Sequence, residues 1–143
     1  MKNLITLFSL LLFTSCQIRP KEINYGEDSC YYCSMTIVDR QHAAELVTHK
    51  GKVYKFDAAE CMINSLSEMD LESIALFLVT DYSAPEQLID AKTATFLVSP
   101  EIPSPMRANL SALHSKDSAQ SLLNAKNGRL FSWLEIQLYL KGK

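Results

Sequence analysis

Three sulfur-bearing side chains stand within six residues of one another, at Cys30, Cys33 and Met35. Thiolate and thioether sulfurs are soft ligands that select Cu(I), and thiolates also suit zinc and iron–sulfur clusters. Met35 favours copper, because a thioether adds little to a zinc site. If residues 33 to 37 are extended, Cys33 and Met35 lie two apart and point to the same side of the strand. The competing interpretation is a Cys30–Cys33 disulfide or simple apolar packing, with Met35 in the core.

The amino terminus has the pattern of an export signal. Lys2 precedes an apolar run from Leu4 to Phe13, which is too short to span a bilayer, and small residues then lead to Cys16. Small residues directly before a cysteine are similar to a bacterial lipobox, although Phe13 stands where leucine is usual. We therefore expect residues 1–15 to be a lipoprotein signal peptide and Cys16 to be the lipid attachment site. A plain signal peptide cut elsewhere, or an anchor helix, is the alternative.

This signal predicts a location in the cell envelope, with the domain tethered to a membrane and facing the periplasm or the cell exterior. Such compartments are oxidising. Beyond Cys16 three cysteines remain, Cys30, Cys33 and Cys61, and an odd number favours a free thiol or a metal ligand over a disulfide framework. Removing Lys2 lowers the basic count from 14 to 13 against 16 acidic residues, for a net charge of −3. With no basic stripe present, nucleic acid is not an expected partner.

The remaining chain predicts a tether over residues 16–29 and one domain over 30–143, with approximate halves 30–91 and 92–143. Residues 45–49 and 52–56, joined through Gly51, predict a β-hairpin. Asp57 and Glu60 have the spacing of a capping box, and the apolar residues that follow predict a helix. In that helix Met62 falls on the apolar stripe, which indicates a core role. Residues 74–80 predict a buried strand, and 85–91 a short polar helix or turn.

The second half shows a comparable series. Residues 93–99 and 108–114 predict strands, separated by a loop in which Pro100, Pro103 and Pro105 forbid regular structure and stiffen the chain before Met106. A helix is expected from Ser115 or Asp117 through 125, then an Asn-Gly turn, then a closing helix from Ser132. Strand–strand–helix thus appears twice along the chain, which indicates two small related halves.

These motifs, taken in order, resemble the NosL family. The resemblance rests on Cys30-x-x-Cys33-x-Met35, on Phe56-Asp57 leading to Glu60-Cys61-Met62, on Asp81-Tyr82, on Ile89-Asp90-Ala91, on Pro105-Met106 and on Asn127-Gly128. It covers essentially the whole mature chain. Two departures concern loop geometry: Arg107 stands where family members usually have glycine, and Asn127 stands in place of the first of two glycines.

The resemblance implies a membrane-tethered lipoprotein that binds Cu(I) and serves as an accessory factor for maturation of nitrous oxide reductase, in denitrification. It implies partners in the maturation machinery or the reductase itself, and no enzymatic activity. It also implies the fold class expected here, α+β with two small strand–strand–helix–strand subdomains of related topology. Among the candidate copper ligands Cys33 comes first, as a thiolate, and Met35 second. Cys30 is either a ligand or a partner of Cys33, and Met106 is a third ligand presented by the stiffened loop. Cys61 stays undecided.

Other functions have less support from the residues. A thioredoxin-type dithiol would place Cys30-x-x-Cys33 at a helix N-terminus, whereas β-favouring residues follow here. Haem attachment requires histidine after the second cysteine, where Ser34 stands. No hydrolase nucleophile motif is present. His42, His49 and His114 lack mutual metal-ligand spacing and are expected at the surface or in turns. The main alternative is another extracytoplasmic metal-handling or dithiol redox lipoprotein.

Overall fold

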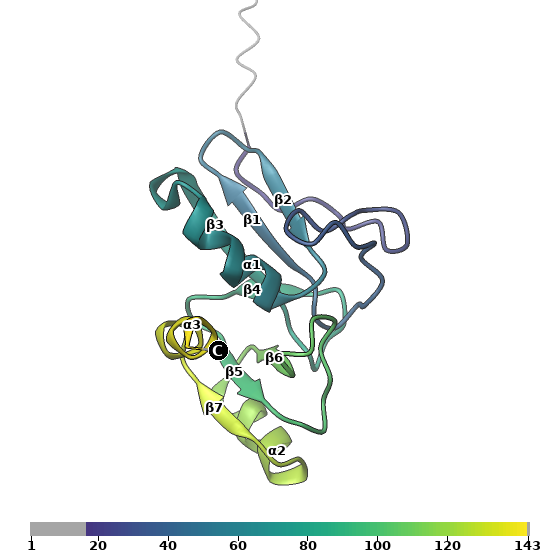
Figure 1. Ribbon diagram of the computed structural model, residues 1–143, viewed down its shortest axis with the longest axis vertical. Coiled ribbons are helices and arrows are strands. Elements are labelled where there is room, and N and C mark those ends of the chain that lie inside the picture. Colours follow the sequence, from purple (N-terminus) through teal and green to yellow (C-terminus); the bar gives the residue numbers. More distant parts are fainter. Residues whose placement is uncertain (1–16, 143) are drawn as a thin grey trace, which may run out of the picture.

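A computed structural model describes residues 17–142 (Figure 1). The expected signal peptide and Cys16 lie outside the described residues. The fold is α+β, as the sequence predicts, and is built from two small antiparallel sheets. Figure 1 shows the first sheet at the top of the molecule and the second at the bottom.

The first sheet has the strand order β2-β1-β3-β4, with every neighbouring pair antiparallel. The glycine turn of the predicted hairpin is present, and Gly51 has the positive φ of 78° that such a turn requires. After β2 a helix of about two turns leads through two 3₁₀ turns into the long strand β3. The elements are β1 (Ala44–Thr48), β2 (Val53–Phe56), α1 (Ala59–Ser65), η1 (Leu66–Glu68), η2 (Leu71–Ser73), β3 (Ile74–Thr80) and β4 (Leu88–Asp90).

The second sheet repeats this plan without a fourth strand. Its order is β6-β5-β7. In each sheet the strand that comes first in the sequence, β1 or β5, lies between the second strand, β2 or β6, and the strand that follows the helix, β3 or β7. Ser115 caps the second helix, and Ser132 with Glu135 forms a capping box on the closing helix. The elements are β5 (Thr95–Val98), β6 (Leu110–Leu113), α2 (Lys116–Ala125), β7 (Arg129–Phe131) and α3 (Trp133–Lys141).

One hydrophobic core joins the two sheets. Phe56 and Met62 from the first half and Phe96, Leu110 and Ile136 from the second are fully buried members of the same cluster. Met62 therefore has the core role that its position on the helical stripe predicts. A parallel bridge between Asp81 and Ala112 adds a backbone link between the sheets. The halves are topologically related but pack as one body around a shared core.

Residues 17–29, expected to act as a tether, contain no helix or strand and lie against the first sheet. The side chain of Ile23 is buried in the core. The Lys21 amide donates to Glu45 at 3.2 Å, and the Lys55 ammonium donates to the Glu22 carbonyl at 2.5 Å. The Gln17 carbonyl oxygen lies beside Gly51 in the hairpin turn. The described chain therefore begins at the turn end of the first sheet.

Two local predictions are wrong. Residues 88–90, predicted as polar helix or turn, form β4, because β3 offers a free edge with which this short segment pairs. The capping box at Asp57 is absent: α1 begins after Ala58, and no side chain caps it. The spacing of Asp57 and Glu60 fits a capping box, but both carboxylates have other partners.

Candidate metal centre

Four potential ligands converge where the 30–33 turn meets the end of β2 and the start of α1. One ligand atom each from Cys30, Cys33, Asp57 and Cys61 lies within 4.8 Å of the others. Cys30 and Cys61 are buried, at 2% and 1% exposure, while Cys33 is half-buried. All three cysteines are free. Among residues 17–142 this is the one group of at least three histidine, cysteine or acidic side chains with such convergence.

Hydrogen bonds shape the loop that carries the first two thiols. The Cys30 amide donates to the Met35 carbonyl at 2.8 Å, and the Ser34 amide donates back to the Cys30 carbonyl at 2.9 Å. Ser34 has a φ of 63°, in the left-handed region. The Tyr31 amide donates to the Lys55 carbonyl at 2.8 Å, which fixes the loop to β2. The condition that would place Cys33 and Met35 on one side of a strand is not met, because the chain turns at Ser34 and residues 33–37 are not extended throughout.

The pKa values of the three cysteines are shifted in different directions. The pKa of Cys30 is lowered to about 6, chiefly because the Cys61 thiol donates to its sulfur, with further help from the backbone amides of Cys33 and Asp57. That same bond and burial raise the pKa of Cys61. Burial also raises the pKa of Cys33, and the neighbouring Cys30 and Asp57 charges add to the effect. Of the three cysteines, Cys30 is therefore the one that loses its proton most readily.

The sequence predicts Asp57 as a helix-capping residue, but the structure places its carboxylate in the cluster. Its side chain is 3% exposed, and its Oδ2 accepts a hydrogen bond from the Cys33 thiol at 3.5 Å. Its Oδ1 is buried with no hydrogen-bond partner. Buried carboxylate oxygens are normally satisfied by donors or by cations. An unpartnered oxygen beside three thiols therefore fits a site for a positively charged ion.

The two predicted methionine ligands lie on separate loops. Met35 is 53% exposed, and its carbonyl accepts the Cys30 amide. Met106 is 41% exposed, on the proline-rich loop between β5 and β6. Left-handed residues flank both, Ser34 before Met35 and Arg107 after Met106, with φ values of 63° and 61°. Arg107 thus adopts the conformation for which glycine is the usual residue.

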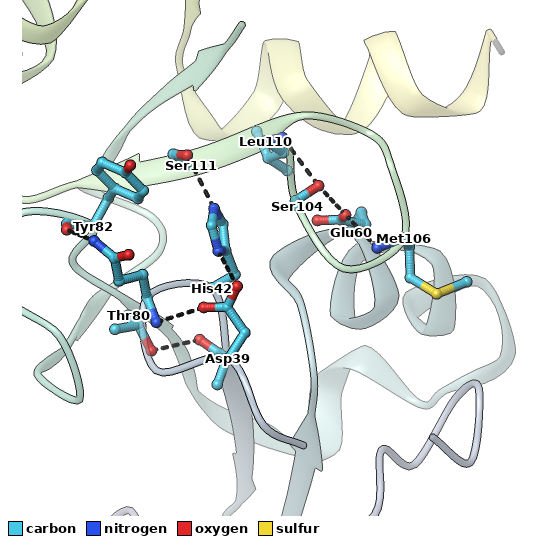
Figure 2. Close-up of polar contacts among 11 residues, drawn as sticks. Asp39, His42, Glu60, Thr80, Tyr82, Ser104, Met106, Leu110 and Ser111 are labelled. Atoms are coloured by element: carbon cyan, nitrogen blue, oxygen red, sulfur yellow. Dashed lines mark hydrogen bonds and ion pairs between the residues drawn. The ribbon is translucent and has the colours of Figure 1, made fainter. Parts of the chain in front are cut away.

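The Met106 loop is fastened to α1 by the residue next to Cys61. Glu60 is 1% exposed, and its Oε1 accepts both the Ser104 hydroxyl and the Met106 amide, the latter at 3.3 Å. The Ser104 hydroxyl oxygen also accepts the Leu110 amide at 3.2 Å. Figure 2 shows this arrangement, with the Met106 thioether directed away from the Glu60 carboxylate. Sequence reasoning missed this role of Glu60, because the apparent capping box accounted for it.

The histidines belong to polar contacts between the two halves. His42 lies in the predicted turn but is buried, with Nδ1 at 2.9 Å from Asp39 and Nε2 at 3.2 Å from the Ser111 hydroxyl on β6 (Figure 2). His114 is exposed, and its Nδ1 lies 2.6 Å from Asp81, at the end of β3. Neither belongs to the sulfur cluster. His42, just before β1, contacts Ser111 on β6, and His114, just after β6, contacts Asp81, just after β3. Each histidine therefore links the two halves.

By fold and site, the described chain is a small α+β domain with a half-open cluster of three thiols and a carboxylate. Residues 20–140 match the NosL family model, and the chain belongs to the NosL family. A solved structure with the same fold is the copper chaperone NosL from Shewanella denitrificans. It has 21% sequence identity and a TM-score of 0.71, over 83% of this chain and 96% of that one. No curated protein matches. Within residues 17–142, no helix has the length and apolar character needed to cross a membrane.

Proposed function

We propose that this protein is a lipid-anchored envelope carrier that binds Cu(I) at its sulfur cluster and delivers it for maturation of nitrous oxide reductase. The observation that carries the proposal is the convergence of the buried Cys30 and Cys61 thiols with the half-buried Cys33 thiol and an unpartnered carboxylate oxygen of Asp57. Membership of the NosL family and the fold shared with a copper chaperone support the choice of copper. The role is that of a carrier and not of an enzyme.

The cluster suits a transferable monovalent ion. The Cys30 thiolate neutralises one positive charge, and loss of one further thiol proton on binding supplies a second thiolate. Cys30 and Cys61 lie inside, so Cys33 is the cysteine that an incoming ligand reaches first. Met35 and Met106 are proposed as thioether ligands on the exposed side. A site that is open on one side allows a partner sulfur to attack before the original ligands leave, whereas a closed four-ligand site retains its metal.

A chelator competition with Cu(I) tests the ligand assignment. Cys33→Ser is expected to remove most of the Cu(I) affinity while the far-ultraviolet circular dichroism stays unchanged. Ser29→Ala, a neighbouring substitution outside the cluster, is the matched control. Undiminished binding by Cys33→Ser would exclude Cys33 as a ligand.

The redox state of the cysteines should control binding. Oxidation of two of the three thiols to a disulfide removes thiolates that Cu(I) needs, so reduced protein should bind Cu(I) tightly and oxidised protein much more weakly. Cu(II) should bind poorly in both states, because it favours nitrogen and oxygen donors in tetragonal geometry. Titrations of both forms, with thiols counted before and after, check this. Equal affinities would show that the cysteines are not the ligands.

Dithiol exchange is the second candidate, and the low pKa of Cys30 favours it. An exchanging dithiol, however, needs a nucleophilic thiolate that a substrate can reach. Here the thiolate, Cys30, is 2% exposed, while the accessible Cys33 has a raised pKa. A disulfide-reductase assay separates the two functions: rapid turnover without Cu(I) binding would replace the carrier proposal.

The anchor and the partner need tests of their own. Acylation of Cys16 with more than one chain would give stable attachment to a membrane. Cys16→Ala should therefore release the protein from the membrane fraction and leave Cu(I) affinity unchanged. Mixing the copper-loaded protein with copper-free nitrous oxide reductase should move copper to the reductase, measured as metal content after separation. Membrane retention of Cys16→Ala or absence of transfer would refute the corresponding part of the proposal.

A further inference from the structure

Glu60 is a buried acid whose two donors come from the Met106 loop. The Ser104 hydroxyl and the Met106 amide both donate to Oε1, while Oε2 is buried without a partner. Burial raises the pKa of this carboxyl, although both hydrogen bonds oppose the rise. A carboxyl in such a position costs stability, and neutral donors offset only part of the cost. Packing alone therefore gives no reason for an acid here.

The contacts made by Glu60 attach the Met106 loop to the helix that carries one thiol of the cluster. Glu60 and Cys61 are consecutive residues in the first turn of α1, so the loop and the Cys61 thiol are fixed to the same turn of this helix. The bonded group is the backbone amide of Met106 itself. Ser104 also accepts the Leu110 amide, and its carbonyl accepts the Arg107 amide at 2.9 Å, which closes the loop around Met106.

The loop prepares Met106 for this contact without burying it. Pro103 and Pro105 restrict the backbone on either side of Ser104. The left-handed conformation of Arg107 then turns the chain back immediately after Met106. Met106 is therefore 41% exposed, while its loop is held by the bond from the Met106 amide to Glu60 and by the bond from the Arg107 amide to the Ser104 carbonyl. Such a loop presents a ligand to a partly open site instead of packing a methionine into the core.

We propose that Glu60 is a positioning residue for copper binding, which holds Met106 where its thioether completes the coordination of Cu(I) at the cysteine cluster. The inference rests on the proposed function and deepens it. It assigns Glu60 a role through Met106 and not as a ligand. Residues that orient metal ligands from outside the coordination sphere typically contribute about 10- to 100-fold to metal affinity.

A double-mutant cycle tests the inference in the Cu(I) competition assay. Met106→Leu should lower Cu(I) affinity about tenfold or more, and Glu60→Ala by a similar factor. Combining the two should lower it no further than Met106→Leu alone, because Glu60 acts only through Met106. Glu60→Gln, which keeps an oxygen acceptor for Ser104 and Met106, should stay within about threefold of the unmodified protein. X-ray absorption at the copper edge should show one sulfur fewer in both Met106→Leu and Glu60→Ala.

The outcomes distinguish this inference from the proposed function. Absence of Cu(I) binding by the unmodified protein overturns both. Normal binding that Met106→Leu leaves unchanged overturns the inference alone. Equal losses from Glu60→Ala with and without Met106→Leu also overturn it, since Glu60 would then act on the cluster or the fold. If Glu60→Ala does not fold, Ser104→Ala replaces it in the same cycle, with the same expectation and the same contradicting result.

Discussion

The two halves of this protein share one topology but differ in what they bury. The buried polar residues of the first half include four acids, Glu45, Asp57, Glu60 and Asp81. Those of the second half, Ser99, Ser104 and Ser111, carry only neutral hydroxyl groups. Neutral hydroxyls are cheaper to satisfy than carboxylates. The second half therefore buries the less costly polar groups, while the first half buries carboxyl groups, one of which, Asp57, belongs to the cluster.

The starts of the two equivalent helices show the difference most directly. Ala58 and Ser115 precede α1 and α2 with nearly the same backbone, at φ −151°, ψ 154° and φ −144°, ψ 157°. Ser115 accepts the amide of Ser118, the third residue of α2. The third residue of α1 is Cys61, whose amide has only the Ala58 carbonyl as partner, at 3.1 Å. The second half has a capping serine where the first half has Ala58, and the residue whose amide is capped, Ser118, corresponds to Cys61 of the cluster.

The largest effect is expected from exchanging these third residues. Cys61→Ser gives α1 the residue that α2 has and removes a thiol from the cluster, so Cu(I) affinity should fall about 100-fold or more, near 3 kcal/mol. The reciprocal change, Ser118→Cys, adds one thiol outside the cluster and should leave the affinity unchanged. Chelator competition measures both. Equal affinities for Cys61→Ser and the unmodified protein would remove Cys61 from the site.

The second prediction concerns buried charge in the central strands. Glu45 is the second residue of β1 and is fully buried, whereas Phe96 holds this place in β5. Burial raises the pKa of Glu45 from 4.5 to about 7, against one hydrogen bond from the Lys21 amide. Between these values the unfolded chain loses its proton while the folded protein keeps it. The contribution of Glu45 to the stability of the metal-free protein should therefore fall by about 2 kcal/mol as the pH rises from 5 to 7.

Urea denaturation at a series of pH values checks this slope. Glu45→Gln has no proton to lose and should remove that decrease, whatever its effect on absolute stability. Glu101→Gln serves as the control, because Glu101 is an exposed acid whose pKa is lowered. Parallel pH profiles for the unmodified protein and Glu45→Gln would show that Glu45 is ionised in the folded state at pH 5.

The third prediction adds and removes caps. Ser115→Ala should lower the free energy of unfolding by about 1 kcal/mol, since the Ser118 amide loses its acceptor. Ala58→Ser should raise it by less, because the new hydroxyl must also fit a site with no exposure. Urea midpoints measure both changes. A destabilised Ala58→Ser would mean that the cluster end of α1 has no room for a cap.

Sequence patterns predicted the elements better than the site. The hairpin, the buried strand β3 and both later helices follow from local periodicity, a glycine turn and serine caps. The site depends on contacts between distant residues. Asp57 and Glu60 match a capping box in spacing, yet they contact Cys33 and Ser104 from other segments. Contacts between residues so far apart in the chain produce no periodic pattern in a single sequence, so they could not be predicted from it.

The methionines illustrate the same limit. Met35 lies beside Cys33 on one side of the chain only if residues 33–37 are extended. The single left-handed residue Ser34 removes that extended geometry. The sequence does indicate that Met106 sits on a stiff loop, since three prolines are visible there. It gives no sign that Glu60, more than forty positions away, bonds to the Met106 amide.

The smallest effect is expected at the turn after Met106. A left-handed conformation costs a residue with a Cβ atom about 1–2 kcal/mol, and glycine avoids this cost but loses more entropy on folding. Arg107→Gly should therefore stabilise the protein by about 0.5 kcal/mol, while Ser34→Gly in the Met35 loop should give a similar gain. Neither change removes a proposed ligand, so Cu(I) affinity should stay within about threefold if the loops keep their shape. Urea midpoints and chelator competition on the same samples measure both properties. A stabilised Arg107→Gly that binds Cu(I) much more weakly would show that the arginine side chain, and not the turn alone, helps to place Met106.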